Sequence, residues 1–333
     1  MPATYAFSSA ELEAAAALVH AQMPPTPAYA WPLIAQRAGA EVWIKHENHT
    51  PTGAFKIRGG IVYMDELAKA GATASGDVEV AGVITATRGN HGQSIARAAR
   101  AAGLGATILV PHGNSTEKNA AMRAFGARLI EHGRDFDEAK DEAVRLAAAE
   151  GLHMVPSYHP ALVKGVATYA LELFRSIADL DAVYVPIGMG SGISGLIAAR
   201  DALGLRTEIV GVVADAAPAV ALSFEAGHPV PTNSARTFAD GMACRDPHPD
   251  AVRVICRGAA AIVRVTEDEI AEAMRILYED THNVAEGAGA AALAALLKDG
   301  RRRPGAKLGV ILSGGNVDRP VYGDVLAGRT PGV

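Results

Sequence analysis

Short apolar segments alternate with helical segments between residues 78 and 155, and this alternation restricts the fold more than any other feature of the sequence. The strand-like runs lie at residues 80–87, 106–111 and 128–131, and the helical stretches at residues 91–102, 116–125 and 136–150. Strand–helix units of this length are typical of βαβ connections and of a parallel sheet buried on both faces. The sequence therefore predicts an α/β fold, with ligand-binding loops at the carboxyl ends of the strands.

Further strands and helices are expected on both sides of this region. Strand-like runs lie at residues 41–45, 182–186, 207–213, 260–266 and 307–312, whereas residues 71–77 and 215–240 read as loops. The chain has 333 residues, which is long for one hydrophobic core and suits two lobes. We expect a large domain formed by residues 1–77 and 156–333, and a small domain, residues 78–155, inserted into it.

Composition limits the possible partners and compartment. The 31 Lys and Arg residues and 36 Asp and Glu residues give a formal charge of −5, and no basic patch with interleaved aromatics occurs, so no nucleic-acid partner is expected. No uncharged run is long enough to span a bilayer, and the first residues lack the basic start of a signal peptide. Cys244 and Cys256 are the only cysteines, which favours a reducing, cytoplasmic location over a disulfide framework.

One lysine stands where covalent chemistry is feasible. Lys56 follows a Gly-Ala-Phe step and begins a predicted helix. The positive end of a helix dipole and partial burial both disfavour the ammonium form, so they lower the pKa of a lysine. The neutral amine attacks aldehydes, as a Schiff-base lysine must. For this residue taken alone, an ordinary surface lysine is the favoured interpretation, and three further stretches reverse that preference.

A glycine-rich turn is a candidate anion site. Residues 188–192, Gly-Met-Gly-Ser-Gly, follow the run at 182–186 and precede a helix predicted at 194–203. Backbone N–H groups in such a turn can close on a phosphate, and the helix N-terminus adds a favourable field. The segment matches neither a Walker loop nor the Gly-x-Gly-x-x-Gly spacing of dinucleotide sites. A tight structural turn is therefore an equally good interpretation.

Three other positions are candidates for ligand contacts. Asn90 lies in a loop between a strand and a helix, where it can face a ligand or simply cap the helix. Ser313 ends the run at 307–312 and can offer a hydroxyl to a ring nitrogen, although a plain turn is the favoured interpretation of this segment alone. Glu286 precedes a helix of small residues, where the helix dipole stabilises its charge or it lines the site.

Five motifs, in this order, resemble those of the pyridoxal-phosphate enzymes of fold type II. The most similar branch is the serine/threonine dehydratase family, which includes serine racemase. The motifs are Thr52-Gly-Ala-Phe-Lys-Ile-Arg-Gly59, Thr87-Arg-Gly-Asn-His91, Pro186-Ile-Gly-Met-Gly-Ser191, Ala239-Asp-Gly-Met-Ala243 and Ser313-Gly-Gly-Asn316. The resemblance covers nearly the whole chain. It implies a two-lobed fold similar to that of tryptophan synthase β, with a largely parallel sheet flanked by helices in each lobe, and a homodimer.

The resemblance implies contacts to pyridoxal 5'-phosphate. Lys56 corresponds to the lysine that holds the cofactor covalently, and Phe55 to the residue packed behind its ring. Asn90 is similar to the asparagine that binds the ring 3′-oxygen, and Ser313 to the residue that faces the pyridine nitrogen. Glu286 belongs to the same set, and the residues corresponding to the phosphate loop are Gly188, Met189, Gly190, Ser191 and Gly192.

The resemblance also implies a reaction. The loop similar to the one that holds the substrate carboxylate contains Thr87, Arg88, Gly89 and His91, and His159 lies where relatives place a residue near the substrate side chain. The expected activity is that of an ammonia-lyase, which converts a β-hydroxy amino acid, by default threonine or serine, into a 2-keto acid and ammonia with Lys56 as general base. Ser313 would make the ring a weaker electron sink than an aspartate does, which favours β-elimination over transamination.

Arg88 keeps other activities open. It stands where the racemase branch has an acid–base serine, and a guanidinium is a poor general base. It can instead pair with a second carboxylate, so a 3-hydroxyaspartate is an alternative substrate, beside phenylserine-like compounds. Racemisation, β-replacement and a non-catalytic binding protein are further alternatives. The cation site of the racemase branch is matched only by Asp215, with Ala221 near the second position, so no metal is expected.

Overall fold

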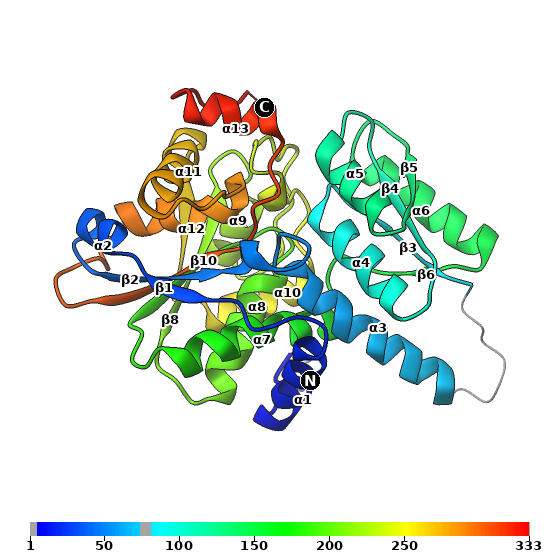
Figure 1. The fold of residues 1–333 in the computed structure, drawn as a ribbon, viewed down its shortest axis with the longest axis horizontal. Coiled ribbons are helices and arrows are strands. Elements are labelled where there is room, and N and C mark those ends of the chain that lie inside the picture. The colour runs from blue at the N-terminus through cyan, green and yellow to red at the C-terminus, as the bar shows by residue number, and fades with distance from the viewer. Residues whose placement is uncertain (1–4, 74–80, 333) are drawn as a thin grey trace.

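The structure is a computed structural model that describes residues 5–73 and 81–332. Two β-sheets lie beside each other, and helices cover both faces of each sheet (Figure 1). The strands of the smaller sheet fall between residues 83 and 154, and those of the larger sheet come from both sides of that segment. The predicted α/β class, with largely parallel sheets flanked by helices, is confirmed.

The larger sheet has six strands in the order β1-β2-β10-β7-β8-β9. Their bounds are β1 Ala28–Ala30, β2 Glu41–His46, β10 Lys307–Leu312, β7 Ala182–Pro186, β8 Glu208–Ala214 and β9 Ala261–Val265. All neighbours are parallel except the edge strand β1, which is antiparallel to β2. Every residue of β7 is buried, because helices cover both faces and the strand is apolar throughout.

The two faces of this sheet bury separate apolar clusters. Alternate residues of β7 enter them: Ala182 and Tyr184 pack on one side, Val183 and Val185 on the other. The helices on the first side are α2 (Pro32–Ala38), α11 (Glu267–Thr281), α12 (Gly287–Lys298) and α13 (Arg319–Leu326). Those on the second side are α1 (Ser9–His20), α7 (Pro160–Ser176), α8 (Ser191–Ala202), α9 (Ala219–Ala226) and α10 (Pro249–Gly258).

The smaller sheet has four parallel strands in the order β5-β4-β3-β6. They are β3 (Val83–Ala86), β4 (Ala106–Val110), β5 (Arg128–Glu131) and β6 (His153–Met154). The helices α4 (Asn90–Ala101) and α5 (Thr116–Ala124) pack on one face, and α6 (Phe136–Glu150) packs on the other. Parallel strands place their carboxyl ends at one edge, so the loops after β3 and β4 face the larger sheet's loops.

Helix α3 (Lys56–Thr73) joins the two lobes. Its residues Ile57, Ile61 and Met64 belong to the same apolar cluster as Val83 and Ile108 of the smaller sheet. The helix therefore contributes to the core under that sheet although it precedes residue 78. The expected domain boundary at residues 77–78 lies outside the described residues.

Several elements differ from the sequence-based expectations. Four elements, β1, α2, α10 and α13, were not predicted. Strand β1 and helices α2 and α13 have three to eight residues, and segments this short give little periodic signal. Helix α10 has ten residues and was overlooked, although the shorter α5 was predicted. Helix α9 lies within residues 215–240, which were expected to be loop. Residues 71–73 continue α3 rather than forming a loop, and residues 74–77 lie outside the described range. Helix α8 begins at Ser191, three residues before the predicted start, and this changes the glycine-rich turn.

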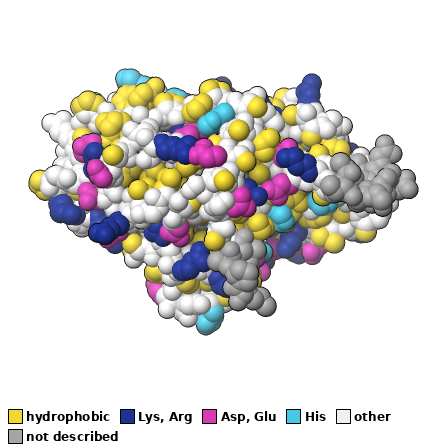
Figure 2. Space-filling model, turned by 90° about the horizontal axis from the view of Figure 1, so that it is seen from below, with side chains coloured by type: hydrophobic (Ala, Val, Ile, Leu, Met, Phe, Trp, Pro, Cys, Tyr) yellow, Lys and Arg dark blue, Asp and Glu magenta, His cyan; other side chains and the backbone are white. Residues whose placement is uncertain are grey.

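Two surface features complete the description. No helix in the described part of the chain is long and apolar enough to cross a membrane. Figure 2 shows Lys and Arg side chains interspersed with Asp and Glu over the visible face. Charge of one sign does not gather among the described side chains seen there, which is the mixed pattern that the overall charge balance leads one to expect.

Candidate active site

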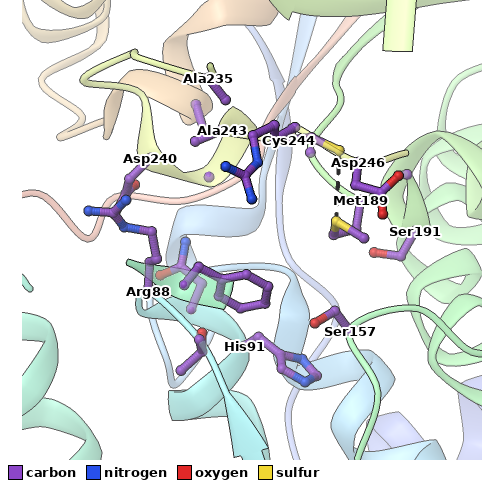
Figure 3. Close-up of a pocket in the computed structure, with 18 of the residues that line it drawn as sticks. Arg88, His91, Ser157, Met189, Ser191, Ala235, Asp240, Ala243, Cys244 and Asp246 are labelled. Atoms are coloured by element: carbon purple, nitrogen blue, oxygen red, sulfur yellow. Dashed lines mark hydrogen bonds between the residues drawn. The ribbon is translucent and has the colours of Figure 1, made fainter. Parts of the chain in front are cut away.

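A cavity of about 540 Å³ lies between the two lobes. It is lined by the start of α3, the loop after β3, the turn after β7, residue Ser313 after β10 and residues 240–249. These segments include the loops that follow the carboxyl ends of parallel strands, where α/β folds bind ligands. Figure 3 shows Arg88 and His91 approaching the cavity from one side and Met189 and Ser191 from the other.

Lys56 is the first residue of α3 and points into the cavity. Its Nζ donates a hydrogen bond to Ser191 Oγ at 3.1 Å and lies 4.9 Å from the centroid of the Phe55 ring. Burial lowers the pKa of Lys56 to about 8, and the negative charge of Glu286 only partly opposes this. A neutral amine is therefore accessible near physiological pH, as covalent chemistry at a carbonyl requires.

A buried ionic network fixes the first turn of α3. The guanidinium of Arg58, two residues after Lys56, donates to Glu47 at 2.7 Å and to Glu172 at 2.6 Å. Glu172 also pairs with Lys45 at 2.5 Å; Lys45, Glu47 and Arg58 are buried, and the Glu172 side chain is 9% exposed. Bidentate contacts of this kind restrict both the position and the rotation of the helix start. The network thus holds Lys56 at a defined place in the cavity wall.

The turn at residues 188–192 forms an anion cradle. None of the backbone N–H groups of residues 188–193 donates a hydrogen bond to a described residue, so they are available to a ligand. Gly190 caps α8 with a left-handed φ of 98°, which favours glycine. A Cβ at Gly188 would collide with the carbonyl oxygen of Gly241. The sequence therefore folds a close-packed turn whose free donors and helix dipole favour a phosphate.

A chain of polar contacts runs along the opposite wall. Asn90 Nδ2 donates to Glu286 Oε1 at 2.6 Å, and Asn316 Nδ2 donates to Asn90 Oδ1 at 2.8 Å. Lys118 Nζ lies 3.2 Å from Glu286 Oε2 and 2.7 Å from Asp240 Oδ2. Burial raises the pKa of Glu286, while the charge of Lys118 opposes this shift. Glu286 is the N-cap residue of α12, makes no side-chain cap and lines the cavity, so its position agrees with both expectations.

The loop after β3 supplies a second set of free donors. The backbone N–H groups of Arg88, Asn90 and His91 donate to no described residue, whereas Gly89 N donates to Thr87 Oγ1 at 3.0 Å. Helix α4 starts here with Gly89 as its N-cap, so Asn90 does not cap it as the turn interpretation expected. Its amide is free to make the contacts described above. The loop can hold a carboxylate by the same physics as the phosphate cradle.

His91 is kept neutral. Burial, followed by the charge of Lys56, lowers the pKa of His91 to about 3. Its Nε2 is buried and finds no hydrogen-bond partner among the described residues. An orphaned polar atom in a cavity wall is usually explained by a missing ligand or water. The imidazole therefore offers a hydrogen bond to a ligand without a charge.

The structure brings together all but one of the residues expected at the site. Ser313 is buried at the cavity wall, where its carbonyl oxygen accepts a hydrogen bond from Phe55 N at 3.0 Å. His159 is the exception. Its Nδ1 accepts from Ala161 N at 3.2 Å and caps α7, and its ring packs on Tyr63 at 5.1 Å. A capping role satisfies this histidine away from the cavity, so the expected substrate contact is not found.

Several lining residues were not anticipated. Lys118 and Asp240 contact Glu286 or its partner, and Arg245, Asp137 and Cys244 also line the cavity. Asp240 lies within a motif that carried the family resemblance, which was a usable signal. Lys118 lies in an ordinary amphipathic helix and Arg245 in a loop, so no sequence pattern pointed to either residue. Among the described residues, no group of three or more His, Cys, Asp or Glu could hold a metal ion.

An anion cradle that faces a lysine of lowered pKa defines a class of protein: an enzyme that binds a phosphorylated carbonyl compound through its lysine. Residues 20–314 match the family described as pyridoxal-phosphate dependent enzyme. The chain therefore belongs to the pyridoxal-phosphate-dependent enzyme family, as its motifs indicated.

Individual relatives lie in the dehydratase branch. The chain is 32% identical over 308 residues to L-threo-3-hydroxyaspartate ammonia-lyase of Saccharomyces cerevisiae, covering 92% of each chain. It is 35% identical over 284 residues to L-threonine ammonia-lyase of Geobacter sulfurreducens, covering 85% of this chain and 69% of that one. It spans only 55% of the biosynthetic L-threonine dehydratase IlvA of Haemophilus influenzae. The structure of maize serine racemase matches with a TM-score of 0.88 and 26% identity, over 97% of this chain and 98% of that one.

The residues present fit pyridoxal phosphate. Unpartnered N–H groups at 188–193 suit its phosphate, and the adjoining cavity of about 540 Å³, which Lys56 also lines, has room for its ring. Lys56 has the lowered pKa needed to react with an aldehyde. The turn itself requires glycine at both positions, because a Cβ at Gly188 would meet Gly241 O and one at Gly190 would meet Ala251 Cβ. Each chemical feature of the cofactor therefore has a matching group in the cavity.

Proposed function

We propose that this protein is a pyridoxal-phosphate-dependent ammonia-lyase that converts a β-hydroxy amino acid into a 2-keto acid and ammonia. The observation that carries the proposal is the position of Lys56 Nζ, 3.1 Å from Ser191 Oγ at the start of the phosphate cradle. One lysine can then reach a carbonyl whose phosphate sits in the cradle. The names of the Geobacter and yeast relatives, both ammonia-lyases, support this reaction.

The cofactor contacts follow from the cavity wall. The free N–H groups of residues 188–192 would bind the phosphate, with the Ser191 hydroxyl beside them. Asn90, Ser313 and Phe55 all line the cavity, and in this proposal they would hold the ring through its oxygen, its nitrogen and its face, respectively. When bound, the cofactor withdraws electrons from the substrate Cα and so acidifies its proton.

Lys56 moves the proton in this proposal. Burial lowers its pKa to about 8, so a sizeable neutral fraction can accept the Cα proton at working pH. The free N–H groups of Arg88, Asn90 and His91 hold the substrate carboxylate at the start of α4. His91 stays neutral and therefore does not compete as a base. The β-hydroxyl then leaves as water, taking the proton that Lys56 removed from Cα. Hydrolysis of the released imine by water yields the keto acid and ammonia.

Arg88 favours a second candidate substrate, a 3-hydroxyaspartate. Its side chain is exposed, lines the cavity and has no ion pair with a described residue. Figure 3 shows it extending on the same side of the cavity as Asp240. A guanidinium with no internal partner suits a second carboxylate on the substrate, and the yeast relative's name supports such a substrate. The same guanidinium argues against racemisation, because it does not serve as a base.

Three features of the whole protein belong to the proposal. Residues 78–155 act as a small domain that closes over the substrate, supported by the contacts of Lys118 across the cavity. The protein is a homodimer, on the strength of the family resemblance. It works in the cytoplasm, supported by two cysteines that are both free.

The test is 2-keto-acid release by the cofactor-loaded protein from L-threonine, L-serine, L-threo-3-hydroxyaspartate and phenylserine. Keto acid from any of them, lost in Lys56→Ala, supports the proposed reaction. Arg88→Met should lower kcat/KM for the dicarboxylate at least tenfold relative to threonine, by about 1.4 kcal/mol of discrimination, whereas Arg88→Lys retains the charge. Bound cofactor with no keto acid from any substrate would contradict the proposal.

A further inference from the structure

Lys118 links the two lobes through the cavity wall. It belongs to α5 of the smaller sheet's lobe, whereas its partners Asp240 and Glu286 belong to segments of the larger lobe. The Lys118 side chain is 6% exposed and the Glu286 side chain is 4% exposed. Buried ion pairs are strongly destabilised when one partner is removed, since the other charge stays buried without compensation. The protonation of Glu286 therefore depends on Lys118.

Without its partner, each member of this pair would shift toward its neutral form. Burial alone lowers the pKa of Lys118, but the charges of Glu286 and Asp240 raise it above the ordinary lysine value. Burial raises the pKa of Glu286, and Lys118 provides the largest opposing effect. If Lys118 lost its charge, the pKa of Glu286 would rise further, because burial would act without its main opposing charge.

The ionisation of Glu286 controls Asn90. A carboxylate only accepts hydrogen bonds, so Glu286 Oε1 requires the Nδ2 end of the Asn90 amide at 2.6 Å. Asn316 Nδ2 donates to the Oδ1 end at 2.8 Å, which fixes the same orientation. One hydrogen of Asn90 Nδ2 then remains for a ligand in the cavity. A protonated Glu286 can donate instead of accept, so its contact with Asn90 Nδ2 weakens and only the contact from Asn316 still orients the amide.

We propose that Lys118 is a positioning residue: it keeps Glu286 ionised, and Glu286 in turn holds the Asn90 amide toward the ring oxygen of pyridoxal phosphate. The inference rests on the role of Asn90 in the proposed function. Lys118 comes from the smaller lobe, so the position of that lobe against the larger one affects the hydrogen bond from Asn90 to the cofactor.

The test is a pH titration of cofactor absorbance in the loaded protein without substrate, so it does not depend on the lyase reaction. Lys118→Met should weaken cofactor binding roughly tenfold, the worth of one lost hydrogen bond in a charged network. It should also add a pH-dependent transition that the wild type lacks, from protonation of Glu286. Lys118→Arg keeps the charge and should show the wild-type titration.

Two further variants separate positioning from general damage. Glu117, the neighbour of Lys118 on α5, accepts from Arg319 N at 2.9 Å and also links the lobes without touching Glu286. Glu117→Ala should leave the cofactor titration unchanged. Lys118→Met combined with Glu286→Gln should lose the added transition. A Lys118→Met titration identical to wild type, or a Glu117→Ala titration that changes in the same way as that of Lys118→Met, overturns the proposal.

Glu286→Gln serves if Lys118→Met does not fold. Glu286 offers Oε1 to Asn90 and Oε2 to Lys118, whereas a glutamine has only one acceptor for both. This variant should therefore weaken cofactor binding without adding a pH transition. Unchanged cofactor affinity in Glu286→Gln would also overturn the proposal.

Discussion

At the residue scale, the pKa values of two lysines in one cavity are shifted in opposite directions by their surroundings. Lys56 faces a serine hydroxyl, and burial lowers its pKa to about 8. Lys118 lies between two carboxylates, which raise its pKa. When the surroundings shift the pKa values of two titratable groups apart, each group can take a different chemical role. Lys56 is thus fitted to exchange protons and attack a carbonyl, while Lys118 stays charged.

The pH dependence of cofactor loading tests this division. The reactive amine is neutral, and its fraction rises as pH increases through the pKa. The rate at which pyridoxal phosphate forms its covalent link to the cofactor-free protein should therefore rise with a midpoint near 8. Stopped-flow absorbance measures it, with Lys56→Ala as a control that shows no covalent phase. A midpoint at about 10.4, the ordinary lysine value, would show that burial does not lower the pKa of Lys56.

Sequence reasoning recovered residues whose position in a motif fixes their neighbours. Three of them lie in segments that follow parallel strands: Lys56 after β2, Asn90 after β3 and Ser313 after β10. Parallel strands bring such segments to one edge of a sheet. Lys118 could not be found this way, because its partners are distant in sequence and meet it only through the packing of two lobes. His159 was misplaced for a related reason: a histidine before a helix serves equally as a cap, and here it does.

At the element scale, the start of α8 determines the cradle. The helix begins at Ser191 because Gly190 adopts a left-handed conformation, and no sequence pattern distinguished this start from residue 194. The difference matters, because the earlier start leaves the N–H groups of residues 188–193 at the helix end, free to bind an anion.

Gly190→Ala should weaken phosphate binding as well as stability. A left-handed alanine costs about 1–2 kcal/mol, and its Cβ would lie 2.9 Å from Ala251 Cβ. Gly204, just after the same helix, has φ of 64° and no atom near its Cβ position. Gly204→Ala should therefore lose similar stability but keep cofactor affinity, as judged by denaturant unfolding and cofactor titration. Equal cofactor affinity in both variants would contradict the role of the cradle.

The buried network at the start of α3 predicts a large effect on stability. Arg58→Met leaves Glu47 and Glu172 without their main cation, and breaking a buried pair costs about 3–5 kcal/mol. The free energy of unfolding, measured in urea, should fall by that amount. A loss below about 1 kcal/mol, the value of surface pairs, would show that the network is not needed.

The same network makes a pH-dependent contribution. Burial alone would raise the pKa of Glu172, but the hydrogen bonds and charge of Arg58, with those of Lys45, lower it to about 2. A depressed folded-state pKa stabilises above the unfolded value, and this stability is lost as pH falls from about 4.3 towards 2. Arg58→Met should flatten that part of the stability–pH curve, and an unchanged slope would contradict the assignment.

At the scale of the whole molecule, two sheets meet across one cavity and a few polar contacts bridge them. Besides Lys118, the pair Asp137–Arg245 crosses the cavity mouth, and Ser115 donates to Asp318. The apolar runs of the strands predicted both sheets, because buried parallel strands are continuous and hydrophobic. The bridging contacts could not be predicted, since they depend on how two separately patterned lobes are oriented.

The Asp137–Arg245 pair should add little stability. The Arg245 and Asp137 side chains are 46% and 50% exposed, and such pairs contribute about 0–1 kcal/mol. Arg245→Met should therefore change the free energy of unfolding by less than about 1 kcal/mol, in contrast to Arg58→Met. Urea unfolding of the two variants side by side makes the comparison. Equal losses would show that the mouth pair is shielded from water.

The most direct test of the account is the site of the covalent cofactor link. The loaded protein is reduced with borohydride, digested, and its peptides are analysed by mass spectrometry. Three lysines line the cavity, Lys56, Lys118 and Lys140, and only Lys56 combines a lowered pKa with contact to the cradle. The account predicts the cofactor on Lys56 alone. A label on Lys118 or Lys140, or bound cofactor that leaves every lysine unlabelled, would contradict it.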